Sequence, residues 1–177
     1  SNCFLKSNIL KQLILKPKKY ILVSCHREEN VDNENSFNMI VDSLNGLADH
    51  FKFPIIFSTH PRTRKMIEMR KPKMNKLIML KDPLGFIDYN NLQINSFIVL
   101  SDSGTISEES SILKFPAIMI RKAHERPEAM DEGTVIMSGL QKNRIIESIN
   151  ITLESFKSGY IPNTVFDYDI DNVSVKV

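Results

Sequence analysis

The sequence predicts an α/β fold built on a doubly wound, Rossmann-like parallel sheet. Short apolar segments recur along the 177 residues, and each is followed by a segment of helical character. The segments are apolar throughout rather than at every second residue, which is typical of strands buried on both faces of a sheet. Strands that alternate with helices in this way form α/β domains. We therefore expect one α/β domain over residues 1–177.

Six segments are expected to form the strands of this sheet. Each combines Ile, Val, Leu, Met or Phe in a short run bounded by polar or charged residues, a composition that favours buried strands. The sixth segment is a short one of four residues. In chain order they are residues 20–24, 54–59, 77–80, 97–101, 117–120 and 134–137.

Three helices are predicted directly from the sequence. Residues 3–15 would form a lead-in helix that breaks at the Lys-Pro-Lys-Lys segment 16–19. Apolar residues at 3.6-residue spacing predict a second helix that begins near Asn35 or Ser36, and a third near the C-terminus. Residues 158–177 show little periodicity. The spaced apolar positions are Phe37, Ile40, Val41, Leu44 and Leu47 in the second helix, and Ile145, Ile146, Ile149, Leu153 and Phe156 in the third.

Composition and charge exclude several classes of protein. The chain carries 23 basic and 21 acidic side chains, and this balance argues against a nucleic-acid-binding protein. Its two cysteines are far apart and form no CxxC pair, so we expect no disulfide framework and a cytoplasmic location. No apolar run approaches the roughly 18 residues of a membrane span, and no signal-peptide pattern is present, so no membrane contact is expected.

Metal or redox chemistry is not expected either. The four histidines share neither HxxxH nor HxH spacing, and no full glycine-rich dinucleotide fingerprint is present. We therefore predict no metal site and no cofactor. Cys25 has no second thiol beside it, and we interpret it as a small core residue.

The segment after the predicted strand 97–101 could bind a phosphate. Ligands of open parallel sheets bind beyond the carboxyl ends of the strands, where helix N-termini present free N–H groups. Ser103 is expected to cap the next helix, and Gly104 would let the backbone approach a phosphate closely. Glu108 and Glu109 lie about one turn further on, and one of them could reach a ribose. The alternative is an ordinary N-cap followed by a solvated acidic turn.

Polar residues follow the other strands at the same edge. His26 and Arg27, after the first strand, suit a diphosphate, because arginine forks onto its oxygens and histidine can carry a proton. The alternative is a loop whose charges pair among themselves. His60, with Arg62, follows the second strand, where a capped helix start is the alternative. Arg126 follows the fifth, as a ligand for an anion or a partner for a nearby glutamate.

Four segments together resemble one known family. They read SCHREEN, STHPRT, LSDSGTISEES and HERPEAMDEGTV, in this order. Their order and spacing resemble the C-terminal half of the non-hydrolysing UDP-N-acetylglucosamine 2-epimerases, over about residues 7–139 and more loosely beyond. The combination of SDSG, a Glu pair and ERPE is specific, whereas each part alone is not. HPRT and DPLGFIDYNNL, residues 82–92, resemble most closely the branch that acts on UDP-linked N-acetylated 6-deoxy-L-sugars and forms UDP-N-acetyl-L-fucosamine.

This resemblance implies a two-domain fold of the GT-B type, with the substrate between two Rossmann-like domains. The whole chain would be the C-terminal, UDP-binding domain, because no segment matches the family's N-terminal half. Its implied partners are UDP or a UDP-N-acetyl-hexosamine, the N-terminal half and, at full length, a second copy in a homodimer. The implied reaction eliminates UDP across C1–C2 to give a 2-acetamidoglycal and re-adds it with C2 inverted, for bacterial capsule or O-antigen synthesis.

The same resemblance assigns residues to the reaction centre and the phosphates. His26 matches the family's catalytic histidine, and Arg126 matches the arginine of ERPE near the phosphates. Ser103, Gly104 and Thr105 match the diphosphate-binding turn. Thr105 departs from the usual Ser-Gly-Gly, although its backbone N–H can still serve.

Further matches concern the nucleoside and a second site. Glu109 matches the carboxylate that holds the ribose hydroxyls, and Leu84 and Tyr89 fall where the family encloses the uracil. Glutamine is usual at Leu84, so only a main-chain contact would persist there. Arg27 and His60 match positions that some members use for a regulatory nucleotide-sugar.

Two other functions remain open at the level of sequence. One is a non-catalytic module that binds UDP-sugars, and the other is the donor-binding half of a GT-B glycosyltransferase. The ERPE segment and the pair His26-Arg27 favour the epimerase over the transferase. On the epimerase assignment, this chain lacks the acid/base carboxylates of the N-terminal half, and we expect it to be inactive alone.

Overall fold

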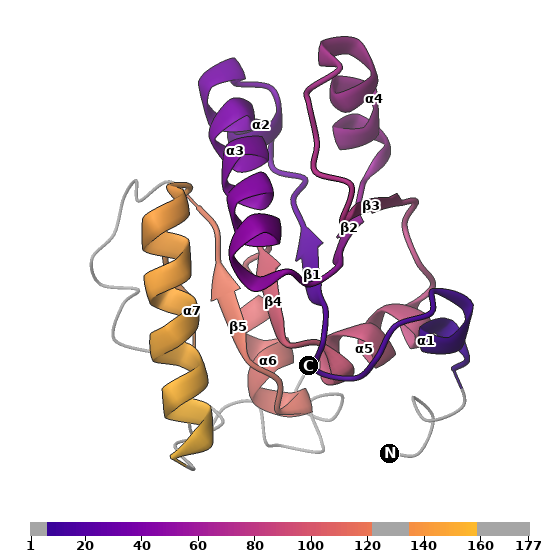
Figure 1. Ribbon diagram of the computed structural model, residues 1–177, viewed down its shortest axis with the longest axis vertical. Coiled ribbons are helices and arrows are strands. Elements are labelled where there is room, and N and C mark those ends of the chain that lie inside the picture. Colours follow the sequence, from indigo (N-terminus) through magenta and orange to yellow (C-terminus); the bar gives the residue numbers. More distant parts are fainter. Residues whose placement is uncertain (1–6, 122–134, 159–177) are drawn as a thin grey trace, which may run out of the picture.

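The computed structural model describes residues 7–121 and 135–158. Six parallel strands form one sheet in the order β3-β2-β1-β4-β5-β6. Helices cover both faces, so the predicted α/β, doubly wound, Rossmann-like class is confirmed (Figure 1). The strands are β1 (Ile21–Ser24), β2 (Ile55–Ser58), β3 (Ile78–Lys81), β4 (Ile98–Ser101), β5 (Ala117–Met119) and β6 (Ile136–Met137).

The six strands lie within or next to their predicted positions. The two central strands, β1 and β4, hold almost entirely buried side chains, as continuous apolar runs predict. The register places Ser24 opposite both Ser58 and Ser101, so three hydroxyl-bearing residues end neighbouring strands side by side. This row marks the carboxyl edge of the sheet. Residue 134, the predicted start of the sixth strand, lies outside the described residues.

Two apolar clusters, one on each face, hold the helices to the sheet. One cluster joins the strands to helices α2 (Glu28–Val31), α3 (Glu34–Phe51), α4 (Pro61–Arg70) and α7 (Lys142–Lys157). The other joins them to helices α1 (Ile9–Gln12), α5 (Phe86–Asn95) and α6 (Ile106–Leu113). In Figure 1, α3 and α7 lie together on one side of the sheet, and α1 lies beside α5. No helix of the described residues is long and apolar enough to cross a membrane.

The predicted helices are found, with one correction. α3 begins at Glu34, capped by Asn33, whose Oδ1 accepts a hydrogen bond of 3.0 Å from the backbone N–H of Ser36. α7 covers the apolar positions expected near the C-terminus. The lead-in helix is shorter than predicted within its described part. α1 ends at Gln12, because the chain turns at Ile14, which has a left-handed φ of 55° that a helix cannot contain.

Candidate functional site

Several of the predicted site residues lie where the strand order reverses, between β1 and β4. β1 leads to α2 and α3 on one face of the sheet, whereas its neighbour β4 leads to α6 on the other face. The two outgoing chains separate beyond the carboxyl ends of these strands, and a crevice at such a switch point is the usual ligand site of an open α/β sheet. His26 and Arg27 follow β1, and Ser103 and Gly104 follow β4, so the sequence predicted residues on both sides of this switch point.

Asp102 ties the two sides together, although the sequence analysis gave it no role. Its side chain is fully buried directly after β4. Oδ2 accepts hydrogen bonds from the backbone N–H groups of His26 at 3.0 Å and Arg27 at 2.9 Å, and from Asn30 Nδ2 at 3.1 Å. The Cys25 thiol donates to the same oxygen at 3.1 Å. A buried carboxylate needs such donors to replace lost water, and here they fix the loop after β1.

The His26 ring is oriented by the same carboxylate. Its Nδ1 lies 3.1 Å from Asp102 Oδ1, and the His26 side chain is 46% exposed. In the neutral ring this contact favours a proton on Nδ1, because a carboxylate only accepts, and it leaves Nε2 as the acceptor that a ligand can meet. Asp102 therefore orients a histidine that remains accessible.

Arg27 lies next to the glycine turn. Its Nε donates to the backbone carbonyl of Asp102 at 2.7 Å. A Cβ built on Gly104 would have an Arg27 guanidinium nitrogen at 3.8 Å as its neighbour. The guanidinium is thus fixed beside the backbone of the turn after β4, where an anion would meet both.

Ser103 does not cap the next helix, contrary to the prediction. α6 begins at Ile106 and its N-cap is Thr105, whose side chain makes no capping hydrogen bond. The first helical hydrogen bond runs from the backbone N–H of Glu109 to the Thr105 carbonyl at 2.9 Å, so the helix starts two residues beyond Ser103. The Ser103 hydroxyl lies 2.9 Å from that of Thr105 and accepts the backbone N–H of Thr105 at 3.4 Å. The backbone N–H of Ser103 donates to Ser101 Oγ at 3.1 Å, so a phosphate bound by these two N–H groups would replace hydrogen bonds within the turn.

Glu109 is the member of the glutamate pair that the surrounding side chains hold. Thr105 Oγ1 donates to its Oε1 at 2.7 Å, and Gln93 Nε2 donates to its Oε2 at 2.6 Å. Thr105 is exposed, whereas Gln93 is fully buried in α5. Gln93 was not predicted, because a single amide within a mostly apolar helix gives no signal in the sequence.

Leu84 and Tyr89 lie on the α5 side of the crevice. Both pack against the apolar cluster shared with α1 and α6. Burial raises the pKa of Tyr89 to about 12, and the carboxylates of Glu109 and Asp102 add to this rise, whereas a hydrogen bond with the Ser24 hydroxyl opposes it. Tyr89 therefore lies near Ser24, the last residue of β1, and within electrostatic reach of Glu109, the predicted ribose contact.

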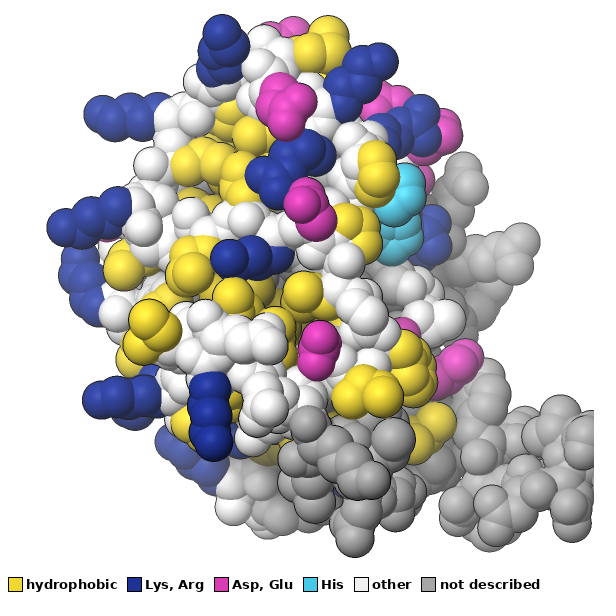
Figure 2. Space-filling model, turned by 90° about the vertical axis from the view of Figure 1, so that its right-hand side faces the viewer, with side chains coloured by type: hydrophobic (Ala, Val, Ile, Leu, Met, Phe, Trp, Pro, Cys, Tyr) yellow, Lys and Arg dark blue, Asp and Glu magenta, His cyan; other side chains and the backbone are white. Residues whose placement is uncertain are grey.

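His60 begins a helix, as the alternative interpretation proposed. Its Nδ1 accepts the backbone N–H of Arg62 at 3.4 Å at the start of α4, where Pro61 occupies the first turn. Arg62, in α4, pairs with Glu28 and Asp32 at the two ends of α2. The rings of His26 and His60 are 6.4 Å apart between centroids. Figure 2 shows histidine side chains at the surface of this side of the molecule, near charged groups.

Of two further predicted residues, Cys25 can be placed and Arg126 cannot. Cys25 is buried, as expected of a core residue, and its thiol also reaches Asp102. Burial, followed by the nearby Asp102 carboxylate, raises the pKa of this thiol well above its ordinary value. Arg126 lies outside the described residues, as do the rest of the ERPE segment and the tail from residue 159.

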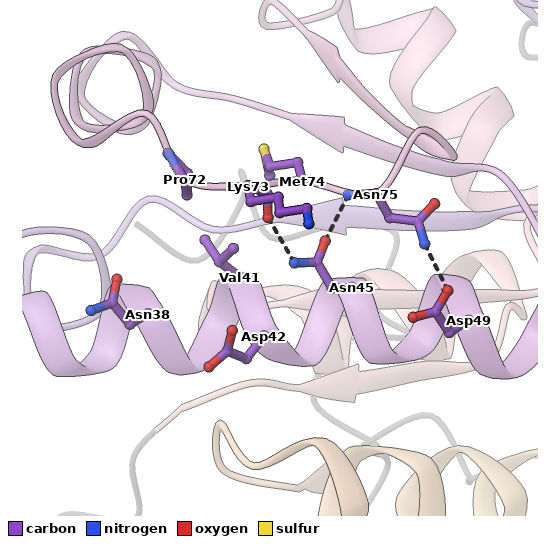
Figure 3. Close-up of a pocket in the computed structure, with 9 residues that line it drawn as sticks. All are labelled: Asn38, Val41, Asp42, Asn45, Asp49, Pro72, Lys73, Met74 and Asn75. Carbon is purple, nitrogen blue, oxygen red and sulfur yellow. Dashed lines mark hydrogen bonds between the residues drawn. The ribbon is translucent and has the colours of Figure 1, made fainter.

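A hollow of about 590 Å³ lies away from these residues, between α3 and residues 72–75. Figure 3 shows Asn45 of α3 bridging to this loop, with its Nδ2 donating to the Lys73 carbonyl at 2.9 Å and its Oδ1 accepting from the Asn75 backbone at 2.8 Å. Asn75 in turn donates to Asp49 at 2.8 Å. None of the predicted site residues lines this hollow, and its hydrogen bonds tie the loop to α3.

Comparison with known proteins supports the resemblance. Residues 2–177 match the family model described as UDP-N-acetylglucosamine 2-epimerase. An enzyme of that name from Methanocaldococcus jannaschii is 38% identical over 138 residues, which are 76% of this chain and 38% of that protein. Its structure in complex with UDP-GlcNAc and UDP superposes with a TM-score of 0.72 at 35% identity, covering 85% of this chain and 43% of that one.

Two further structures extend the comparison. The UDP-N-acetylglucosamine 2-epimerase of Rickettsia bellii is 43% identical, with a TM-score of 0.68, and the match covers 85% of this chain and 40% of that one. A heptosyltransferase from Escherichia coli has a TM-score of 0.54 at 14% identity, over 77% of this chain and 45% of that one, which is a likeness of fold alone. Epimerases and a glycosyltransferase thus share this half of the GT-B-type fold.

The chain spans less than half the length of the relatives that it matches. The family model nevertheless extends over almost every residue of the chain, and two of the quoted motifs, SCHREEN and LSDSGTISEES, lie at the switch point between β1 and β4. The chain belongs to the UDP-N-acetylglucosamine 2-epimerase family.

Proposed function

We propose that residues 1–177 are the C-terminal, UDP-binding domain of an enzyme that inverts C2 of a UDP-N-acetyl-hexosamine. One observation carries this proposal: Asp102 fixes His26 and Arg27 on one side of the switch-point crevice, directly beside the turn at Gly104. A histidine, a guanidinium and a helix start then converge on one place. That combination suits the diphosphate of a nucleotide-sugar.

The remaining site residues would bind the rest of the nucleotide. Ser103, Gly104 and Thr105 would hold the diphosphate through backbone N–H groups, and Glu109 would accept the ribose hydroxyls. The proximity of Tyr89 to Glu109 supports a uracil contact on the α5 side, with Leu84 contributing main-chain atoms. Arg126 would complete the phosphate site. No cofactor takes part in this proposal.

The reaction would proceed by elimination and re-addition. A base removes the C2 proton while the C1–O bond breaks, its electron pair goes to the β-phosphate oxygen of UDP, and a C1=C2 double bond forms. UDP then adds back to C1 as a proton returns to the other face of C2. His26 would stabilise or protonate the departing phosphate oxygen, where negative charge develops. The groups that move the C2 proton would come from an N-terminal half.

Arg27 fits the substrate site better than a separate regulatory one. Its side chain is held against the Asp102 carbonyl and beside Gly104, which directs it to the same diphosphate. His60 lies further out, with one ring nitrogen used at the start of α4. Binding of a second, regulatory nucleotide-sugar by Arg27 and His60 remains a proposal. It requires a ligand that contacts both side chains at once.

The finer assignments rest on the sequence motifs. HPRT and residues 82–92 support a 6-deoxy-L-sugar substrate of the branch that forms UDP-N-acetyl-L-fucosamine. A role in bacterial capsule or O-antigen synthesis, a homodimer at full length and a cytoplasmic location belong to the same proposal.

Solvent-deuterium incorporation tests the proposed chemistry. The chain, preceded by the N-terminal half of a family member, is incubated in D2O with UDP-GlcNAc or the 6-deoxy-L analogue, and NMR follows C2. Deuterium at C2 of both epimers is expected in the two-domain protein and none with these 177 residues alone. Exchange by the chain alone would place the acid/base groups here and refute the half-enzyme proposal. UDP binding without exchange in the two-domain protein would favour a non-catalytic module.

A further inference from the structure

The Glu109 carboxylate is held at both oxygens by residues from two different helices. Gln93 reaches Oε2 from α5, and Thr105 reaches Oε1 from the start of α6, at 2.6 and 2.7 Å. Hydrogen bonds to an ionised carboxylate are among the stronger and more directional ones. The two contacts therefore fix the plane of the carboxylate as well as its position.

The number of these contacts matters for a diol ligand. A carboxylate offers about four lone-pair positions, two on each oxygen. The described residues fill one position on Oε1 and one on Oε2. One acceptor position thus remains on each oxygen, which matches the two O–H donors of a ribose 2′,3′-diol.

Gln93 contacts Glu109 from within the core, where a glutamine is less favourable for stability than an apolar residue. The residue is fully buried, and its Oε1 has no hydrogen-bond partner among the described residues. Rotating the amide would satisfy nothing, because it would turn Oε1 towards the Glu109 carboxylate. A buried polar atom without a partner destabilises a fold, and an apolar residue of similar volume would avoid that cost. A glutamine here is therefore better explained by its effect on Glu109 than by stability.

We propose that Gln93 and Thr105 are positioning residues that orient Glu109 towards the ribose diol of the bound nucleotide. This inference rests on the proposed function, because it requires Glu109 to bind ribose. Neither residue needs to touch the ligand through its side chain. Each side chain holds the Glu109 carboxylate in an orientation in which its remaining acceptor positions face the two hydroxyls of the diol.

The test compares UDP with 2′,3′-dideoxy-UDP, which lacks both hydroxyls. Dissociation constants are measured by ¹H–¹⁵N NMR titration of the 177-residue chain, a method that reaches millimolar affinities. The wild type is expected to bind UDP roughly tenfold more tightly than the dideoxy analogue, the worth of a charge-assisted contact. Gln93→Met should reduce this ratio about threefold or more with dideoxy-UDP affinity unchanged, and Thr105→Val should reduce the ratio by a similar factor whatever its effect on the diphosphate turn. Thr105→Ser, which keeps the hydroxyl, should preserve the ratio.

The outcomes separate the inference from the proposed function. An unchanged ratio in both Gln93→Met and Thr105→Val, or an equal loss of both ligands, would show that the residues serve only the fold and would overturn the inference. A wild type that binds both ligands equally would instead remove the ribose role of Glu109, and one that binds neither would remove UDP binding altogether. Thr105 is exposed, so its variants keep the test open even if Gln93→Met fails to fold.

Discussion

Asp102 Oδ1 lies 3.1 Å from His26 Nδ1, while Oδ2 of the same carboxylate accepts the backbone N–H of His26 at 3.0 Å. One buried side chain therefore fixes both the main chain and the ring of the residue proposed to meet the leaving group. The two residues come from β4 and β1, the strands on either side of the switch point. Exposed catalytic groups work best when a rigid neighbour sets their orientation.

Replacing Asp102 with Asn should destabilise the fold. The amide NH2 would face at least one of the donors that now surround the buried carboxylate, and those donors would lose their charged acceptor. Breaking a buried ionic hydrogen-bond network typically costs about 3 kcal/mol. Urea denaturation of Asp102→Asn should show a loss of this size.

The matched control for that experiment is Asp42→Asn. Asp42 is exposed on α3, and its substitution should change the free energy of unfolding by less than about 0.5 kcal/mol. Equal stability of Asp102→Asn and Asp42→Asn would contradict the central role given to Asp102.

Glu109→Ala should weaken UDP binding by about 1–3 kcal/mol, because the ribose hydroxyls would lose their acceptor. Glu108→Ala is the control, since it removes a carboxylate from the same turn of α6. Its effect should be smaller, because Glu108 is not assigned to the ribose and the loss of a negative charge near the phosphates does not weaken the binding of an anion. Calorimetric or NMR titration with UDP measures both. Equal losses in the two variants would indicate a disturbed start of α6 and not a ribose contact.

Much of the fold could be predicted because apolar runs and the breaks between them are local signals. The strands followed from such runs, α3 followed from apolar residues at 3.6-residue spacing, and the edge residues His26 and Ser103 followed from the ends of predicted strands. The roles of Asp102 and Gln93 could not, since each depends on partners at least 16 positions away along the chain. Ser103 was misplaced as a cap because the first helical hydrogen bond of α6, rather than residue type, decides where the helix begins.

The buried Cys25 thiol should make the folded protein less stable in mild alkali. Burial and the Asp102 carboxylate raise the pKa of its thiol in the folded state, whereas the unfolded thiol ionises near pH 8.5. Below that pH both states hold the proton and the full stability is present. Above it only the unfolded chain releases the proton, so the free energy of unfolding should fall by up to about 1.4 kcal/mol per pH unit.

Cys25→Ser isolates this effect, because the hydroxyl can still donate to Asp102 and does not ionise in this range. Urea denaturation between pH 7 and 9.5 is measured for both proteins in a Cys3→Ser background, which removes the only other thiol. The Cys25 protein should lose stability with pH more steeply than Cys25→Ser. Parallel pH profiles would show that the thiol ionises freely in the folded protein.

The last prediction concerns the two-domain enzyme, meaning this chain preceded by the N-terminal half of a family member. His26→Ala should lower kcat by about 10²–10⁴-fold, the usual worth of a general acid or base, with a smaller change in KM. The reason is that the charge His26 meets develops mainly in the transition state. His50→Ala, at the exposed C-terminal end of α3, should leave kcat unchanged. Steady-state assays of epimer formation measure both.

Asp102 should act on the chemistry through His26 and not independently. Asp102→Asn alone is then expected to lower kcat, but Asp102→Asn added to His26→Ala should lower it little further, because the group that Asp102 orients is already gone. Assays are run at saturating substrate and well below the melting temperature of each variant, so that the stability loss does not enter the rate. Fully additive losses in kcat would mean that Asp102 serves catalysis by another route, such as the placement of Arg27.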